Sequence, residues 1–281
     1  MTTKSKKVDW ILFVVLLILA ALFIFPILLV LMNSFKSQLF MFGAGFKFFK
    51  LPNAESFVGW DNYISGAKKI GIFKAAGYSA WITVASVLVI VICTAMTGWY
   101  ITRVKNKFTS FLYYFFVFNM VVPFQMVMFT MSKLANQLKL DNAFGIIIIY
   151  LGFGAGLSVF MYCGFVKAIP YEIEEAAMID GCSPFGIFFR VVVPMLKPTM
   201  ITVAILNAMW VWNDYLLPSL VIGTKFKTIP IAIQYLKGGY GYIAWGDMMA
   251  MLLVALVPII VFYLSCQKYI IKGVAAGAVK G

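Results

Sequence analysis

The stretch WILFVVLLILAALFIFPILLVLM, Trp10 to Met32, contains 23 residues and no charge. About 20 consecutive apolar residues are enough for a helix to cross the hydrocarbon core of a bilayer. Three lysines precede the stretch, as in a signal peptide, but its length exceeds that of a signal-peptide core. The following Asn33-Ser34-Phe35 also lacks the small residues of a cleavage site. We therefore predict an uncleaved first membrane span.

The composition of the whole chain agrees with a membrane protein. Of its 281 residues, 63% are apolar and 12% are charged, and the mean hydropathy is +0.96. Soluble domains are about 45–50% apolar and about 25% charged, so the composition excludes a disordered chain and an ordinary cytosolic enzyme. The net charge of +13 lies mostly in short pieces between apolar runs, which favours contact with lipid headgroups and no nucleic acid. We predict an all-α integral membrane protein.

Six apolar runs are long enough to span a membrane. They cover residues 10–32, 78–102, 108–131, 144–166, 199–222 and 245–267. Each must be helical, because lipid offers no partner to an open strand edge. Six spans place both termini on one side, and the close group of Arg103, Lys105 and Lys107 favours the inner side for them. We expect three parts: an N-terminal span with an outer loop (1–70), a core (71–267) and a C-terminal tail (268–281).

Residues 167–198 do not resemble a span. Pro170 suits the first turn of a helix, where its missing N–H is not needed, and three glutamates follow at the positive end of the helix dipole. Gly181 predicts the end of this helix. Ser183 predicts a cap for a second helix, and Pro194 predicts its end. The first helix would have about 10 residues and a length of about 15 Å, too short to cross a bilayer.

The charge of this first short helix is unusual. Residues 171–181 contain four acids and no base. One face, at helical spacing, holds Ile173, Ala176, Ala177 and Asp180. A helix lying on the bilayer is one alternative, but such helices are normally basic because the inner leaflet is anionic. A loop packed on its own spans is another. We favour a helix that docks into a groove of a soluble partner.

Candidate residues for a substrate pathway are aromatic rings beside hydrogen-bonding groups, the side chains that suit sugars. They are Asn119, Gln125, Trp210, Trp212, Asn213, Asp214 and Tyr215. The alternative is structural, since Trp and Tyr also form interfacial belts and a proline such as Pro123 often only kinks a span. For Asp214 we favour capping at a helix break over ion coupling, because a lone acid without histidine makes a poor proton relay.

The sequence predicts no covalent chemistry for this chain. It has no histidine, and its four cysteines have neither metal nor redox spacing. It also lacks the run Gly-x-x-x-x-Gly-Lys-Ser/Thr that cradles phosphates. We expect no cofactor or metal bound by this chain, so any ATP-driven step would need another chain.

Three stretches resemble the permeases of ABC importers that use a substrate-binding protein. The one that resembles the EAA loop of this family is Glu175-Ala176-Ala177, with Asp180-Gly181 and Pro194 after it. The stretch similar to the fifth span of sugar permeases is Trp212-Asn213-Asp214-Tyr215-Leu216-Leu217-Pro218. The tail from Gly273 to Gly281 is similar to the end of maltose-type permeases. The resemblance implies a carbohydrate-importer permease of the maltose type, with the type I ABC importer fold.

The resemblance also implies roles and partners. In this family the EAA helix sits in a cleft of the ATPase, which assigns coupling to Glu175, Ala176, Ala177, Asp180 and Gly181. The tail from Gly277 to Gly281 would reach the ATPase dimer. The implied partners are a second permease subunit, two ATP-binding cassette ATPases that hold ATP and Mg, and an extracytoplasmic substrate-binding protein. The implied location is the bacterial inner membrane, with both termini in the cytoplasm.

Other functions stay open at this point. Permeases for a non-sugar solute such as glycerol-phosphate share much of the same pattern. A self-contained secondary transporter would need ion-coupling groups or an inverted repeat, and we find neither. A membrane enzyme would need clustered acids, histidine or a metal site at one interface, and the one acidic cluster, residues 172–180, carries alanines that suit docking better.

Overall fold

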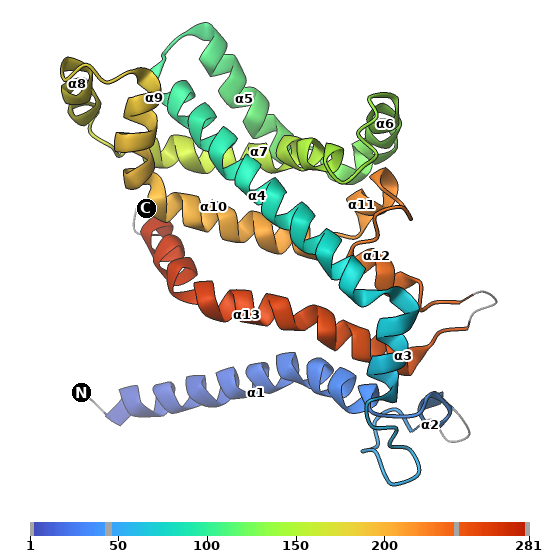
Figure 1. The fold of residues 1–281 in the computed structure, drawn as a ribbon. Coiled ribbons are helices and arrows are strands. Elements are labelled where there is room, and N and C mark those ends of the chain that lie inside the picture. Colours follow the sequence, from blue (N-terminus) through green and yellow to red (C-terminus); the bar gives the residue numbers. More distant parts are fainter. Residues whose placement is uncertain (1–2, 43–46, 239–241, 279–281) are drawn as a thin grey trace. The chain divides into compact units, whose positions relative to one another are not determined.

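A computed structural model describes residues 3–42, 47–238 and 242–278 (Figure 1). The regular structure in these ranges is helical apart from two isolated β-bridges. This confirms the all-α class. The chain forms two compact units, one of Met1–Phe73 with Ala232–Pro258 and the other of Lys74–Ile231 with Ile259–Gly281.

The first unit is built on the N-terminal helix and the start of the C-terminal one. Its helices are α1 (Thr3–Ser34), α2 (Gln38–Phe42), α3 (Asp61–Ile70) and the beginning of α13 (Trp245–Ala278). The Asn62 side chain donates to the main-chain oxygens of Ser34 (2.8 Å) and Lys36 (2.9 Å), which fixes the end of α1 on α3. Most apolar side chains of α1 are exposed, so their surface is left for lipid.

The second unit contains most of the remaining helices and the end of α13; α12 (Ile229–Gln234) is divided between the two units. The others are α4 (Ile72–Arg103), α5 (Lys107–Val121), α6 (Phe124–Gln137), α7 (Gly145–Val166), α8 (Tyr171–Ile179), α9 (Pro184–Ile187), the π-turn η1 (Phe188–Val192), α10 (Val193–Asn213) and α11 (Leu216–Val221). The centre of this unit is α7, which packs on α5 and α10. It also meets α4 closely, because a side chain at Gly98 would come within 2.6 Å of Tyr162.

Five described helices are long and apolar enough to cross a membrane, at Val8–Ser34, Ile72–Arg103, Gly145–Val166, Pro184–Asn213 and Trp245–Tyr269. The predicted span 108–131 is instead a broken pair, α5 and α6, bent by 107°. The cause is Pro123, which lacks an N–H and forces Val122 into an extended conformation with φ −77° and ψ 112°. The pair counts as a sixth span only if both halves are taken together.

The predicted fifth span, 199–222, differs most from the structure. The helical stretch begins much earlier, at Pro184, and ends at Asn213. The prediction that Pro194 ends a short helix is wrong, because α9 continues through η1 into α10. The N–H of Val193 bonds to the oxygen of Phe188, five residues back. This wide turn places Pro194 where its missing N–H interrupts no regular ladder.

Candidate functional site

The short helix α8 has well-defined ends. It begins after Pro170, which is extended at ψ 132° and is the residue before the helix, one position earlier than predicted. Its last residue is Ile179, and Gly181, the predicted stop signal, follows the cap residue Asp180 with φ +79°. The N–H of Gly181 bonds to the oxygen of Met178, and the N–H of Cys182 to that of Ala177, both at 3.0 Å. This pair of bonds is a Schellman motif, which favours glycine at the left-handed position.

A buried carboxylate fastens α8 to the end of α4. Glu174 is 0% exposed. One of its oxygens accepts from the Trp99 indole at 2.8 Å, and the other from the Arg103 guanidinium at 2.7 and 2.9 Å. Arg103 also donates to the oxygen of Ile169 at 2.9 Å, just before α8. The ion pair and its extra donors therefore hold both the helix and the chain that leads into it. We call Trp99, Arg103 and Glu174 the clamp.

Most predicted coupling residues lie on the outer side of α8. Glu175, Ala176, Asp180 and Gly181 are exposed, as are Glu172 and Ile173. Ala177 differs from the expectation of a docking face, because it is buried among the side chains of the unit's own core. Two apolar residues stand out beside the acids: Ile179 is 87% exposed and Phe185, at the start of α9, is 67% exposed. The surface is thus acidic with an apolar edge.

The second helix begins as predicted. The Ser183 hydroxyl accepts from the N–H of Gly186 at 3.2 Å, and Pro184 occupies the first turn. Below α8 and α9, the buried side chains of Ile187 and Phe188 belong to the same apolar cluster as Ala177 and Tyr162. Motion of α8 would therefore be transmitted to a packed core and not to a loose loop.

The candidate pathway residues of α10 lie at the other end of the second unit, near α6 and α11 (Figure 1). Asp214 is half-buried and interrupts the helix with ψ 127°. One of its oxygens accepts from the N–H of Leu216 at 3.0 Å, so it caps α11, the structural role favoured from the sequence. The other accepts from the Tyr150 hydroxyl at 3.1 Å. The Tyr150 ring stands edge-on to Trp210, with centroids 5.4 Å apart.

The other candidates do not all join this group. Trp212 is half-buried, whereas Asn213 and Tyr215 are exposed, and the Asn213 amide donates to the oxygen of Met209 in its own helix. Asn119 packs against Gly156 of α7. A Cβ atom added at Gly156 would lie 2.9 Å from the Asn119 side-chain oxygen. Gln125 is exposed in the first turn of α6. The structure therefore brings together Tyr150, Trp210 and Asp214 at one point.

Sequence reasoning missed several polar residues inside the second unit. From the sequence, Glu174 is only one of four acids in its helix, and Arg103 is only one of a basic group that indicates orientation. Asn207 was also missed: it is buried, and its amide donates to the Ser158 hydroxyl at 3.2 Å, between α10 and α7. Polar residues within apolar spans are the signal that could have identified Asn207 and Ser158.

The prediction for the C-terminal tail falls partly outside the described residues. Residues 279–281 of the tail Gly277–Gly281 lie outside them, and Gly277 falls within α13. For metals, the described residues hold no group of three or more His, Cys, Asp or Glu side chains that could bind an ion.

Comparison with known proteins gives a consistent family. Residues 94–276 match the family described as binding-protein-dependent transport system inner membrane component. The chain is 39% identical to the probable starch degradation products transport system permease protein AmyC of Thermoanaerobacterium thermosulfurigenes, over 94% of each chain. It is 32% identical to the multiple sugar-binding transport system permease protein MsmG of Streptococcus mutans, over 99% of each.

A solved structure shares the fold. It is a crystal structure of a bacterial ABC transporter involved in the import of the acidic polysaccharide alginate, with a TM-score of 0.78 and 21% identity over 96% of this chain and 99% of that one. The similarity confirms the predicted importer permease fold. Because the family match covers well over half of the sequence, the chain belongs to the inner membrane components of binding-protein-dependent transport systems.

Proposed function

We propose that this chain is the permease subunit of an ATP-driven importer of carbohydrate, in particular of oligosaccharides. Its relatives are named for starch degradation products, for multiple sugars and for arabinooligosaccharides. The chain would form the pathway together with a second permease. It would catalyse no reaction itself, since its sequence lacks a phosphate-binding loop.

The observation that carries this proposal is the outer surface of α8. Glu172, Glu175 and Asp180 surround an apolar edge that includes Ile179, on a helix of only nine residues. A short helix with such a surface suits a groove on a soluble subunit. Two ATPases, which bind ATP and Mg, would supply the motion. The clamp would pass it on, because Glu174 ties α8 directly to Arg103 at the end of α4.

The remaining partners and the orientation follow from this assignment. If α8 meets ATPases, its end of the second unit faces the cytoplasm, and both termini lie there as well. The end that carries α6 and α11 then faces outwards, where an extracytoplasmic binding protein would deliver the solute. We place the chain in the bacterial inner membrane, with the residues Gly277 to Gly281 as a further contact to the ATPases.

For the solute we propose contacts near the Tyr150–Asp214 bond. Trp210 is 39% exposed, and its ring is held edge-on by Tyr150, so an aromatic face is positioned at the break between α10 and α11. Trp212, Asn213, Tyr215, Asn119 and Gln125 remain weaker candidates for the pathway. An ordered aromatic face beside a carboxylate suits a sugar ring.

The test is purification of the chain from its native membrane in mild detergent, with mass spectrometry of its partners and transport measured in proteoliposomes. We expect an ATPase and a second permease to copurify, and ATP to drive uptake of oligosaccharides. The Glu175→Lys variant should lose ATP-driven uptake while staying in the membrane. The control is Glu55→Lys, which changes an exposed acid in the first unit. This variant should still copurify with the ATPase subunit.

Two results would contradict the proposal. A chain that purifies alone and transports without ATP would be a secondary transporter, and normal transport by Glu175→Lys would remove the docking role of α8. If the complex took up glycerol-phosphate but no oligosaccharide, its assignment as an importer would stand, and carbohydrate would be excluded as the solute. Trp210→Ala should weaken uptake, and unchanged affinity and rate would remove Trp210 from the pathway.

A further inference from the structure

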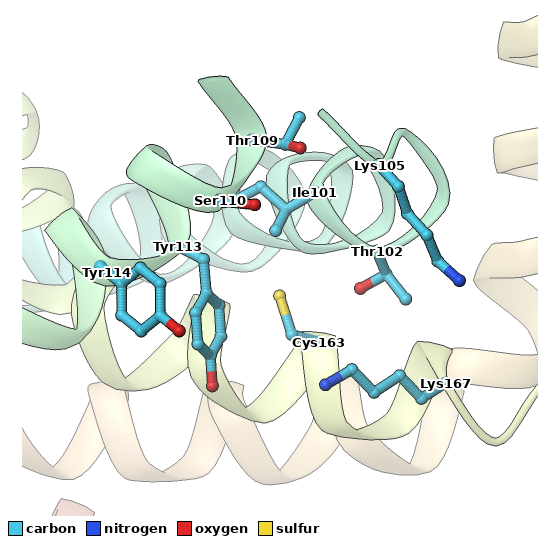
Figure 2. A pocket seen from close by; sticks show the side chains of 9 residues that line it. All are labelled: Ile101, Thr102, Lys105, Thr109, Ser110, Tyr113, Tyr114, Cys163 and Lys167. Carbon is cyan, nitrogen blue, oxygen red and sulfur yellow. The ribbon is translucent and has the colours of Figure 1, made fainter. Parts of the chain in front are cut away.

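A pocket lies beside the clamp, between the ends of α4 and α7 and the start of α5 (Figure 2). Its volume is about 410 Å³. Figure 2 shows Lys105 on the α4 side and Lys167 on the α7 side of the pocket, with Thr102 between them and the two ammonium groups pointing in opposite directions. All nine lining residues belong to the second unit.

The lining of this pocket suits an anion. It contains two lysines and the hydroxyl groups of Thr102, Thr109, Ser110 and two tyrosines, and none of its nine residues is acidic. Lys167 lies over the ring of Tyr113, with its ammonium 6.0 Å from the centroid. Ser110 and Thr109 belong to the first turn of α5, the positive end of that helix dipole. The hydroxyls of Thr102, Thr109 and Ser110 already donate to the main-chain oxygens of Gly98, Val104 and Asn106. A phosphate group would therefore find two cations and the hydroxyls of two tyrosines here.

An apolar surface covers the side of α5 that faces away from Ser110 and Tyr113, and it meets the edge of the pocket at Tyr114. Four phenylalanines repeat at helical spacing along α5, and each is more than half exposed: Phe108, Phe111, Phe115 and Phe118. The rings of Phe111 and Phe115 stack with centroids 6.2 Å apart. We call these four residues the α5 stripe. It lies in one half of the broken span, so its surroundings are apolar.

We propose that the pocket binds the phosphate headgroup of an anionic phospholipid, whose acyl chains lie along the α5 stripe. Basic pockets at the cytoplasmic ends of membrane helices suit such headgroups, because the inner leaflet is anionic. Free phosphate would use the lysines but not the stripe, so the stripe favours a lipid. The assignment to the inner leaflet rests on the orientation proposed above.

The position of the pocket gives the lipid a consequence for coupling. Thr102 precedes Arg103 of the clamp, and Lys167 lies four residues before the first residue of α8. A headgroup held by Lys105 and Lys167 would therefore join the two chain segments that support α8. Anionic lipid should increase ATP-driven transport by keeping the support of α8 in place.

The experiment measures lipid retention, which needs neither ATP nor solute. The purified complex is equilibrated with vesicles of equal phosphatidylglycerol and phosphatidylcholine, extracted in mild detergent and analysed by native mass spectrometry. We expect phosphatidylglycerol to be retained preferentially. Lys105→Gln and Lys167→Gln should each weaken this preference about fivefold, and about 25-fold together, as expected for basic residues at an anionic surface.

Two further variants separate the pocket from general surface charge. Ser110→Leu should weaken retention as well, because it fills the pocket while leaving both lysines in place. The control is Lys133→Gln with Lys139→Gln, two exposed lysines in α6 and the turn after it, which should retain lipid normally.

Three outcomes would overturn the proposal. Normal retention in both the double lysine variant and Ser110→Leu would exclude the pocket. Displacement of the lipid by an equal concentration of inorganic phosphate would indicate a free-anion site. Absence of anionic lipid from the complex would indicate that a protein covers the α5 stripe. None of these results bears on whether the complex imports oligosaccharides.

Discussion

Among the described residues, the first unit buries the charged side chains of Lys36 and Asp247, and the second unit buries that of Glu174. Lys36 and Glu174 have very different partners. In the first unit, Lys36 is 2% exposed and donates to three uncharged oxygens, those of the Asn33 side chain (3.1 Å), Phe48 (3.1 Å) and Lys47 (3.2 Å). In the second unit, Glu174 is 0% exposed but faces a guanidinium. Burial without a counter-charge lowers the pKa of Lys36 below its usual 10.5.

The difference lies in what each charge connects. The partners of Lys36 are within 12 residues of it, so it fastens a local loop. Arg103 and Glu174 are 71 residues apart, so their pair joins separate helices. Carbonyl oxygens can solvate a buried cation wherever the chain folds back. A buried ion pair forms only when two distant segments place their charged side chains beside each other. Such a pair can therefore transmit motion from one segment to the other.

The largest effect should come from breaking the pair on one side. Arg103→Met leaves Glu174 buried without its cation, at a cost of about 3–5 kcal/mol. The chain avoids this cost by releasing α8, so we expect loss of ATP-driven uptake and faster proteolysis between residues 167 and 183. Both can be measured on the purified complex.

The control for Arg103→Met is Lys225→Met. Lys225 also faces a carboxylate, that of Asp141, but at 3.9 Å and with 74% of its side chain exposed. It should change uptake and proteolysis little. If Arg103→Met behaves like this control, the clamp does not hold α8.

A smaller effect is expected at Lys36. Lys36→Met removes hydrogen bonds from a charged group and should destabilise the first unit by about 1.5–3 kcal/mol, whereas the exposed Lys50→Met should not. Between its lowered pKa and 10.5, the unfolded chain binds more protons at Lys36 than the folded chain. The stability of the wild type relative to Lys36→Met should therefore rise with pH in this window.

Thermal unfolding of both proteins in detergent, from neutral pH to just below 10.5, tests this slope. A constant difference across the range would mean that Lys36 keeps its charge in the folded chain without cost. A difference that shrinks as pH rises would give the opposite sign and exclude a lowered pKa.

These two sites also show what the sequence could predict. The predicted helix end at Gly181 and the cap at Ser183 are confirmed, because such caps depend on neighbouring residues. Four of the six predicted apolar runs coincide with single long helices, because lipid imposes their length. Glu174 and Glu175 are adjacent and chemically alike, but successive helical residues point about 100° apart. Which one faces inwards depends on Arg103, and no local pattern identifies a partner so far along the chain.

The prolines illustrate the same limit. The predicted span that contains Pro123 is broken there, whereas the helical stretch continues through Pro194. Both lack the same N–H, so the residue type alone does not separate them. The outcome depends on whether a neighbouring turn can widen, as η1 does before Pro194. The Tyr150–Asp214 bond was missed for a similar reason, because its partners are 64 residues apart.

The next effect in size concerns the end of α8. Gly181→Ala introduces a side chain at φ +79°, where no atom lies within 4 Å, so strain is its main cost. We expect a loss of about 1–2 kcal/mol and partial uncoupling of ATPase activity from uptake. Gly164→Ala is the matched control, because it also has open space but lies within α7. Equal behaviour of the two variants would exclude the left-handed end as a requirement.

The smallest effect should come from the ion pair of the first unit. The Lys69 ammonium lies 2.5 Å from Asp247, but 53% of its side chain is exposed, against 15% for Arg103. The Asp247 side chain is only 8% exposed, but water can reach it where the exposed Lys69 is replaced, and it keeps the Ser65 hydroxyl at 3.1 Å. Lys69→Gln should therefore cost about 1 kcal/mol, less than Arg103→Met. High salt should reduce even this cost, since it screens exposed pairs. Thermal unfolding with and without salt measures both. A loss as large as that of Arg103→Met would mean that short contact distance, and not burial of both partners, gives an ion pair its strength in this protein.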